Sequence, residues 1–418
     1  MIRHVLLLLC AAAVSVAQPL YFPTSNETWA RASQAELGWC AENIDSLVTY
    51  LQRADTRAFI ILVDGRIAME KYFGTFTADS AWYWASAGKT VTSVLVGIAQ
   101  HEGRMDITKS SATYLGSGWS SCTPQQESAI TVRHHLTMTT GIGFKRADDD
   151  CKEPQCLWYK AEPGAVWDYH NAAYLLLQDM IAKAAGMTFQ QYYSAKLAQT
   201  IGMTGRWFDG TLWSRPLVMA RFGLMLLARG TWNGDTIIKD RAYFEAMINT
   251  SQQLNRSYGY LFWLNGKGSF MQPSLPLVFN RDLVPQAPSD MYAGMGKNDQ
   301  RVYVAPSRRM VVVRVGNPAD TVAAAISGFD DELWKRINAL SCNTSVADAE
   351  ASPVNIWPNP AHTTVSFHGD HAVIFDILGH EVATSHTGTV DVSRLPAGTY
   401  RMVVANGKGR SGTVLVVR

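Results

Sequence analysis

The sequence predicts an α/β (α+β) protein in which an antiparallel sheet is flanked by helices, interrupted by a mainly helical lobe, and followed by a small all-β sandwich. Three observations support this fold class. Strand-like segments form two groups more than two hundred residues apart, helical periodicity dominates between them, and the composition changes after Cys342. With 418 residues, 47% of them hydrophobic and 17% charged, the chain can bury a large core and a second small one.

The first strand group is a hairpin near the start of the chain. Residues 58–64 (AFIILVD) and 66–73 (RIAMEKYF) are rich in side chains that favour strands. The dipeptide Asp64-Gly65 joins them, and it accepts the positive φ angles of a tight hairpin turn. We therefore expect one antiparallel pair here.

The second strand group comprises residues 300–305 (QRVYVA) and 310–315 (MVVVRV). A helix is predicted after it, over residues 321–340, and a matching helix before the first hairpin, over residues 42–53. The simplest topology pairs the two strand groups in one antiparallel sheet and covers it with these two terminal helices. The intervening helical segments, 90–100, 172–185 and 217–229 among them, would form the lobe, with a cleft between lobe and sheet.

The N-terminus is typical of a secretory signal. Arg3 precedes an apolar run from Val5 to Ala17, which ends in the small residues expected before a cleavage site. We expect cleavage after Ala17, so that residues 1–17 are the signal peptide. The run is shorter than the roughly 20 residues of a membrane-spanning helix, and no other stretch is long and apolar enough. The sequence therefore predicts an exported chain without a transmembrane segment.

Removal of the signal leaves five cysteines, so at least one thiol stays free or pairs with another molecule. Sequence alone leaves their connectivity open. If the two terminal helices pack side by side, Cys40 and Cys342 lie close together, which makes them the first choice for a disulfide.

Charge and histidine spacing exclude several function classes. The 37 Lys and Arg residues nearly balance the 35 Asp and Glu residues, which disfavours nucleic-acid binding. The ten histidines show no ligand spacing, so we predict no metal and no cofactor. His170 and the His134-His135 pair are expected to be structural or solvent-facing, and residues 148–150 (DDD) to form a solvated loop.

The first chemical motif is Ser86-Ala-Gly-Lys89, which opens a predicted helix. A serine and a lysine three residues apart on a helix share a face, so the lysine nitrogen can lie beside the hydroxyl. Serine is a weak nucleophile and needs such a neighbour. A pattern this short also occurs by chance at capped helix starts, so it needs further support.

That support comes from two downstream motifs. Tyr169-His-Asn171 stands where a turn runs into a helix, and Gly294-Met295-Gly296 precedes the strand at residue 300. Together with Ser-x-x-Lys, this order and spacing resembles the serine β-lactamase and penicillin-binding-protein superfamily, and within it the class C-like group of D,D-peptidases, esterases and 6-aminohexanoate-dimer hydrolases.

The segments between these motifs agree with the resemblance. Residues 130–141 (ITVRHHLTMTTG) look like the family's segment before the tyrosine motif, and residues 257–263 (SYGYLFW) like a stretch before the third motif. The resemblance extends from Glu42 to Leu340. It implies a β-lactamase-like serine hydrolase domain, which we place at residues 18–342.

The residues allow roles to be assigned. Ser86 would attack an ester or amide carbonyl, while Lys89 and Tyr169 share the transfer of its proton to the leaving group. We expect the Lys89 ammonium to lower the pKa of Tyr169 towards the working range. The oxyanion would be held by the N–H of Ser86 and, as the resemblance implies, that of Lys297. Asn171 would bind Lys89 or the substrate.

The third motif departs from the family pattern. Gly294 stands where the family has lysine or histidine, and Met295 where it has threonine, while Gly296 is kept. The resemblance assigns Gly294, Met295 and Gly296 to substrate binding, with a cation at the first position for a substrate carboxylate. A general ester or amide hydrolase is therefore favoured over a strong β-lactamase.

The C-terminal residues form a second predicted domain. Residues 343–352 are small and polar, which is typical of a linker, and short strand-like runs follow at 364–367, 372–376, 399–404 and 413–417. Residues 353–418, with Ile356-Trp-Pro-Asn-Pro360 and the Leu395-Pro-Ala-Gly-Thr-Tyr400 segment, resemble the C-terminal sorting domain of type IX secretion substrates of the Bacteroidetes. The resemblance implies the type IX machinery as a partner and a secreted or surface-attached product that passes through the periplasm.

The sequence thus predicts a secreted serine hydrolase that acts on a small-molecule ester, amide or peptide through a Ser86 acyl-enzyme. Two alternatives stay open from the residues. One is a penicillin-binding or sensor-type module that acylates or binds without turnover, and the other is a D,D-peptidase or β-lactamase. A third, an adhesion protein with a decayed catalytic lobe, conflicts with the presence of Ser86, Lys89 and Tyr169.

Overall fold

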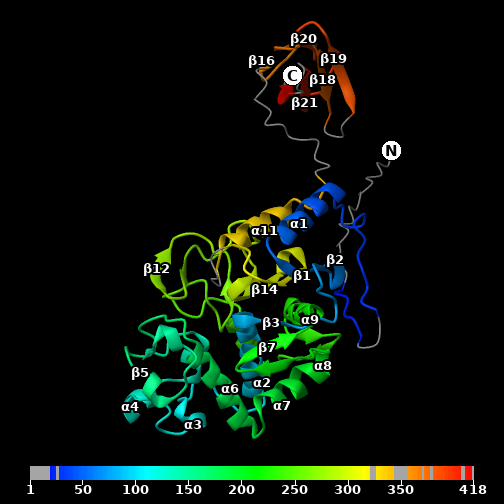
Figure 1. The fold of residues 1–418 in the computed structure, drawn as a ribbon. Helices are drawn as coiled ribbons and strands as arrows, with labels where there is room; N and C mark the ends of the chain where they lie inside the picture. The colour runs from blue at the N-terminus through cyan, green and yellow to red at the C-terminus, as the bar shows by residue number, and fades with distance from the viewer. Residues whose placement is uncertain are drawn as a thin grey trace, which may run out of the picture. The chain divides into compact units, whose positions relative to one another are not determined.

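The computed structural model describes most of the chain, shown in Figure 1, in two compact units, Met1–Cys342 and Asn343–Arg418. The described residues are 19–24, 28–320, 326–342, 356–369, 371–376, 380–405 and 410–416. The predicted signal peptide, the predicted linker and the first five residues of the predicted helix 321–340 lie outside them. Each unit is treated separately below.

The first unit is built on a six-stranded sheet in which every neighbouring pair is antiparallel. In spatial order its strands are β10 (Trp263–Leu264), β13 (Tyr292–Gly296), β14 (Gln300–Ala305), β15 (Met310–Gly316), β1 (Thr56–Val63) and β2 (Arg66–Tyr72). The early and late strands meet where β1 pairs with β15, with Ile60 opposite Val313. The predicted pairing of the two strand groups in one antiparallel sheet is confirmed.

The turn between β1 and β2 has the predicted conformation. Asp64 and Gly65 have φ angles of 52° and 81°, as a tight hairpin turn requires. A Cβ atom at position 65 would lie 2.0 Å from the carbonyl oxygen of Tyr21, so the close approach of the N-terminal segment also demands glycine.

Helices cover both faces of the sheet. Adjacent residues of a strand point to opposite faces, and β14 shows this with Val302 and Tyr303. Val302 faces α9 (Pro216–Leu227), where a Cβ on Gly223 would lie 3.1 Å from it, whereas Tyr303 packs edge-on against Trp334 of α11 (Gly328–Asn338). The sheet is therefore a buried central layer. The prediction that residues 217–229 belong to the lobe is wrong, because α9 packs on β1, β14 and β15 of the sheet.

The terminal helices α1 (Ala41–Arg53) and α11 lie side by side, as Figure 1 shows. The rings of Tyr50 and Phe329 stack at 5.8 Å between them. Cys40 and Cys342 form a disulfide, with their Cα atoms 4.9 Å apart. The first-choice disulfide is confirmed, and it ties together positions 302 residues apart.

The lobe inserted between β2 and β10 is mainly helical. Its central pair of packed helices is α2 (Lys89–His101) and α6 (Asn171–Ala185), which matches two predicted helical segments. The other lobe helices are α3 (Ala112–Leu115), α4 (Pro124–Ala129), α5 (Val132–Leu136), α7 (Phe189–Tyr193), α8 (Gln199–Ile201) and α10 (Arg241–Met247). Short strands complete the unit: β3 (Trp82–Tyr83), β7 (Thr211–Ser214) and β6 (Arg206–Phe208); β4 (Ile142–Gly143) and β5 (Trp158–Tyr159); β8 (Thr231–Trp232) and β9 (Asp235–Thr236); β11 (Phe270–Gln272) and β12 (Leu275–Phe279).

The second unit contains two small antiparallel sheets with a shared apolar core. One sheet has the order β16 (Ile356–Trp357), β17 (Thr364–Phe367) and β20 (Thr389–Asp391). The other has the order β19 (Glu381–Ser385), β18 (His371–Phe375), β21 (Gly398–Ala405) and β22 (Arg410–Val416). The predicted all-β character is confirmed, although β16, β19 and β20 were not predicted.

Among the described residues, no helix has both the length and the apolar character needed to cross a membrane.

Candidate active site

Ser86 and Lys89 lie where a short 3-10 turn, Ala85–Gly88, continues directly into α2. Lys89 Nζ is 2.9 Å from Ser86 Oγ, as expected for residues three apart on one helical face. The preceding Trp84 anchors this turn, because its backbone N–H donates to Leu212 O and its indole N–H to Ser214 Oγ. Both partners belong to β7, so the position of Ser86 is fixed by a neighbouring strand.

The lysine is almost completely enclosed. Its side chain donates to Asn171 Oδ1 at 2.7 Å, and Nζ stands 4.5 Å and 5.2 Å from the ring centres of Tyr174 and Tyr169. Lys89 is only 4% exposed. Burial lowers its pKa to about 7, and the charges of Asp150 and Asp149 offset this only in part. Near neutral pH a large fraction of Lys89 is therefore a neutral amine that can accept a proton.

Tyr169 stands just before α6 and contacts the same serine. The Ser86 side chain lies close enough to its hydroxyl to lower its pKa, and its ring stacks on Trp263 with centres 6.2 Å apart. Burial raises the pKa of Tyr169 well above its ordinary value, and this effect is larger than the lowering by the neighbouring Ser86 side chain. The expectation that the Lys89 ammonium lowers this pKa is wrong in direction, because the enclosing aromatic core favours the neutral phenol.

Asn171 connects the lysine to an acidic loop. Its Nδ2 donates to Asp149 Oδ2 at 3.0 Å while its Oδ1 accepts from Lys89. The backbone N–H of Ala172 also donates to Asp149 O at 2.7 Å. Residues 148–150 were expected to form a solvated loop. The structure corrects this for Asp149, which is half-buried against the start of α6.

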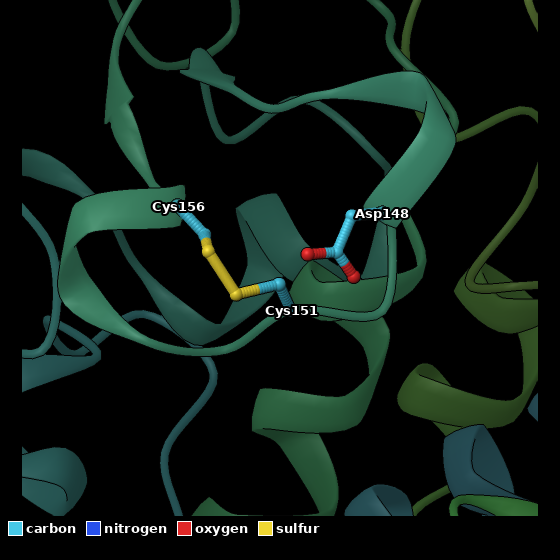
Figure 2. Close-up of side chains that lie close together, drawn as sticks. All are labelled: Asp148, Cys151 and Cys156. Atoms are coloured by element: carbon cyan, nitrogen blue, oxygen red, sulfur yellow. A yellow bond between two sulfur atoms is a disulfide. The ribbon is translucent and has the colours of Figure 1, made fainter.

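The acidic loop is closed by the Cys151–Cys156 disulfide, drawn in Figure 2 with Asp148. Potential ligand atoms of these three residues lie within 4.8 Å of one another. Disulfide sulfurs provide no thiolate, so this group lacks the ligands of a metal site. Among the described cysteines, Cys122 is the free one.

Two of the histidines near the site, His170 and His135, are buried and pack against neighbouring residues. His170 stacks on Phe144 with ring centres 3.9 Å apart, and burial lowers its pKa to about 3. His135 Nδ1 hydrogen-bonds with Ala173 O at 2.8 Å, and burial lowers its pKa to about 4. Both rings are neutral near pH 7, which fits structural roles.

The third motif lies on β13, directly against the Ser86 turn. A Cβ atom on Gly296 would lie 2.9 Å from Ser86 N, and one on Gly294 would lie 3.0 Å from Ala87 O. Both positions thus favour glycine because of close backbone approach. Met295 is 1% exposed and packs in the core, so the structure does not bring its side chain to the site. Neither it nor Gly294 lines the cavity described below.

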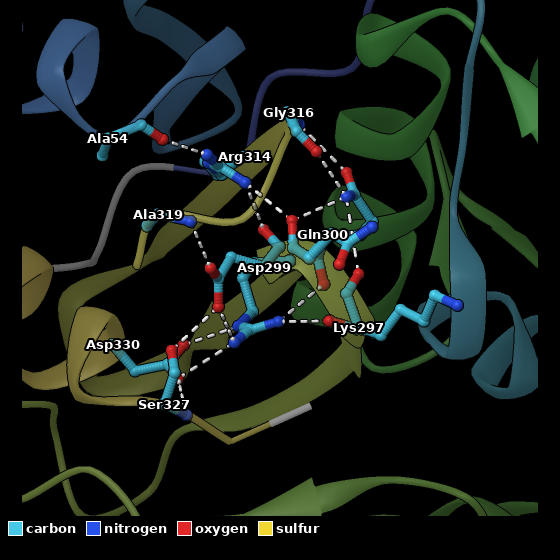
Figure 3. Close-up of polar contacts among 12 residues, drawn as sticks. Ala54, Lys297, Asp299, Gln300, Arg314, Gly316, Ala319, Ser327 and Asp330 are labelled. Carbon is cyan, nitrogen blue, oxygen red and sulfur yellow. Dashed lines mark hydrogen bonds and ion pairs between the residues drawn. The ribbon is translucent and has the colours of Figure 1, made fainter. Parts of the chain in front are cut away.

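The residues after Gly296 form a tight turn in which Lys297 is exposed and Asp299 is buried, shown in Figure 3. Asn298 and Asp299 have positive φ angles of 58° and 57°, which non-glycine residues rarely adopt. Two completely buried arginines hold this conformation. Arg314 Nη1 donates to Asn298 O at 2.8 Å, and Arg301 Nη2 donates to Asp299 Oδ1 at 2.7 Å.

Arg301 also fixes the orientation of the peptide group between Gly296 and Lys297. Its Nη1 donates to Gly296 O at 2.6 Å, and Asp330 balances its charge. The C=O and N–H of a trans peptide point in opposite directions, so the N–H of Lys297 points away from Arg301. Sequence reasoning did not identify this arginine, which a strand pattern alone does not distinguish from a surface residue.

Ser86 and Lys89 open into a cavity of about 580 Å³. Asn171 and Lys297 also line it, whereas Tyr169 lines an adjacent cavity. The remaining lining residues are Tyr83, Ala85, Asp150, Tyr174, Leu175, Phe208, Asp209, Gly210, Thr211 and Trp213. The cavity thus brings the Ser86 hydroxyl and the Lys89 amine together with polar and aromatic walls.

Comparisons with known proteins agree with this arrangement. Residues 44–317 match the beta-lactamase family model, and residues 355–418 match the model of the secretion system C-terminal sorting domain. The putative penicillin-binding protein PbpX of Bacillus subtilis (strain 168) is 26% identical over 172 residues, which are 38% of this chain and 42% of that relative. The matched part therefore spans less than half of that relative.

Solved structures show the same fold. A putative 6-aminohexanoate-dimer hydrolase from Bacillus anthracis has a TM-score of 0.58 at 18% identity and covers 75% of this chain and 86% of its own. A family VIII carboxylesterase has a TM-score of 0.55 at 16% identity and covers 72% of this chain and 98% of its own. Since the family model matches well over half of the residues, this protein belongs to the beta-lactamase family and carries a secretion-system sorting domain at residues 355–418.

Proposed function

We propose that this protein is a secreted serine hydrolase that cleaves an ester or amide bond through an acyl-enzyme on Ser86. The observation that carries the proposal is the 2.9 Å contact between Ser86 Oγ and Lys89 Nζ, whose pKa burial lowers to about 7. A neutral amine at hydrogen-bond distance can remove the hydroxyl proton as the serine attacks a carbonyl.

Tyr169 would complete the proton transfer. Its phenol remains protonated near neutral pH, so it can give its proton to the leaving group and then take up the serine proton from the Lys89 ammonium. A water molecule would then hydrolyse the acyl-enzyme by the same route in reverse. Asn171 would hold Lys89 in place through the 2.7 Å hydrogen bond.

Two backbone N–H groups would stabilise the oxyanion. The first belongs to Ser86 and the second to Lys297, whose peptide is oriented by the Arg301 hydrogen bond to Gly296 O. That charge-assisted hydrogen bond also polarises the peptide, which strengthens the N–H as a donor. Of the predicted substrate-binding residues, Gly296 would act by allowing this strand to approach Ser86.

The C-terminal domain supports export by the type IX secretion machinery. The match of residues 355–418 to a secretion-system sorting domain indicates delivery to the cell surface or the outside. We propose that the folded hydrolase works there, after the sorting domain has directed its passage across the outer membrane.

The proposal is tested by a turnover panel with a short-chain ester, a small amide, a D-Ala-D-Ala peptide and a β-lactam. We expect many product equivalents per enzyme from an ester or amide, and no turnover by Ser86→Ala. A burst that stops at one equivalent with every substrate would instead identify a penicillin-sensor type protein. Preferred turnover of the β-lactam would identify a lactamase, despite the glycine at position 294.

A further inference from the structure

A second cavity of about 490 Å³ lies next to the first, and Tyr169 is part of its wall. Lys89, which lines the first cavity, has its Nζ 5.2 Å from the centre of the Tyr169 ring, so Tyr169 stands between the two spaces. The other lining residues are Arg146, Lys160, Ala165, Val166, Trp167, Asp168, Leu254, Met271, Gln272, Ser274, Leu275, Pro276 and Val278. Most of this lining is apolar.

One wall of the second cavity is the β11–β12 hairpin, which exposes an unusual amount of apolar surface. Leu275 and Val278 are 39% and 54% exposed, and Leu254 beside them is 37% exposed. The stacked rings of Phe270 and Phe279 hold the two strands together. Large apolar side chains gathered at an open cavity are characteristic of a ligand-binding surface.

The charged groups of this cavity do not select a charged ligand. Lys160 and Asp168 form an ion pair with each other, so their charges cancel. Arg146 is an exposed side chain that can remain in water. An uncharged apolar group is therefore the occupant that this lining fits.

The position of Tyr169 indicates which part of a substrate would enter. During acyl transfer the acyl group stays bonded to Ser86, whereas the leaving atom must lie beside the group that protonates it. In the proposed mechanism that group is the Tyr169 hydroxyl, and Tyr169 lines the second cavity, whereas Ser86 and Lys89 line the first. The leaving group therefore departs on the side of the second cavity.

We propose that the second cavity binds the leaving group, and that the substrates are esters or amides with a bulky, uncharged, apolar alcohol or amine part. This inference rests on the proposed acyl-enzyme function and adds the substrate class. The reaction balances simply: the carbonyl-to-leaving-atom bond breaks, the bond to Ser86 Oγ forms, and the serine proton ends on the leaving atom.

The test compares phenyl acetate with 2-naphthyl acetate, which share an acyl group and release phenols of similar acidity. In Leu275→Ser and Val278→Ser, kcat/KM for the naphthyl ester should fall about tenfold, with less than about twofold change for the phenyl ester. Leu277→Ser is the matched control: Leu277 lies on the same strand and is 57% exposed, but it does not line the cavity. Leu277→Ser should leave kcat/KM unchanged for both esters.

Equal losses on both esters, or the same loss in Leu277→Ser, would overturn the leaving-group assignment. The assignment would also be overturned if the loss of kcat/KM in the cavity variants depended on the length of the acyl group. This is measured by comparing phenyl butyrate with phenyl acetate. Binding of 2-naphthol, followed by its fluorescence, gives a readout that needs no catalysis. If the wild type binds 2-naphthol, Leu275→Ser binds it more weakly, and neither ester is turned over, the proposed hydrolase function is wrong but the apolar specificity of the cavity is supported. If it hydrolyses the esters without such binding, the cavity proposal alone fails.

Discussion

Replacement of Lys89 by arginine is expected to lower kcat by about two decades or more, although the positive charge is retained. The guanidinium of arginine does not deprotonate in proteins, so the variant lacks a base beside Ser86. The buried lysine can serve as that base because burial lowers its pKa to about 7. Steady-state kinetics on the preferred ester, with a thermal unfolding control, measures the effect.

The same pKa predicts the pH dependence of the wild type. The active form of Lys89 is the neutral amine, so kcat/KM should rise as the pH increases through about 7 and then level off. The charge of Asp150 raises the pKa of Lys89, so Asp150→Asn should move this rise to lower pH. Because Lys89 and Tyr169 exchange protons, the rising part of the pH profile gives an apparent pKa that belongs to the two residues together. A rise that begins only above pH 9 would contradict a neutral Lys89.

Tyr169→Phe should lower kcat by about two decades or more, the usual scale for a general acid or base. The substitution removes one hydroxyl and keeps the ring that stacks on Trp263. Tyr258→Phe is a matched control, since Tyr258 is also fully buried and packs edge-on against Tyr169, but it lines neither cavity. Normal kcat in Tyr169→Phe, or an equal loss in Tyr258→Phe, would remove the phenol from the proton transfer.

Much of the fold was predictable because the signals were local. The alternating and apolar strands near residues 60 and 313 and the Asp64-Gly65 turn needed only a few neighbouring residues to identify them. The Cys40–Cys342 disulfide followed from the expected packing of two amphipathic helices. In the second unit, β19 and β20 are short and partly exposed, so their sequence patterns were too weak to predict them.

The Ser86–Lys89 contact was predictable for the same reason, because the two residues share one helical face. The protonation of Tyr169 was not, since its pKa depends on burial by residues distant in sequence, such as Trp263. The Asn171–Asp149 contact depends on how a disulfide-closed loop folds back. The role of Arg301 depends on a hydrogen bond to one peptide carbonyl inside the core. Each of these is a tertiary effect without a local pattern.

The most direct test of the central claim is to locate the covalent intermediate. Mature protein treated with a fluorophosphonate, or quenched during turnover of a slow ester, is digested and analysed by mass spectrometry. We expect one adduct, on the peptide containing Ser86, which is absent in Ser86→Ala and strongly reduced in Lys89→Arg. An adduct on another residue, or equal labelling of Ser86→Ala, would contradict an acyl-enzyme formed by Ser86.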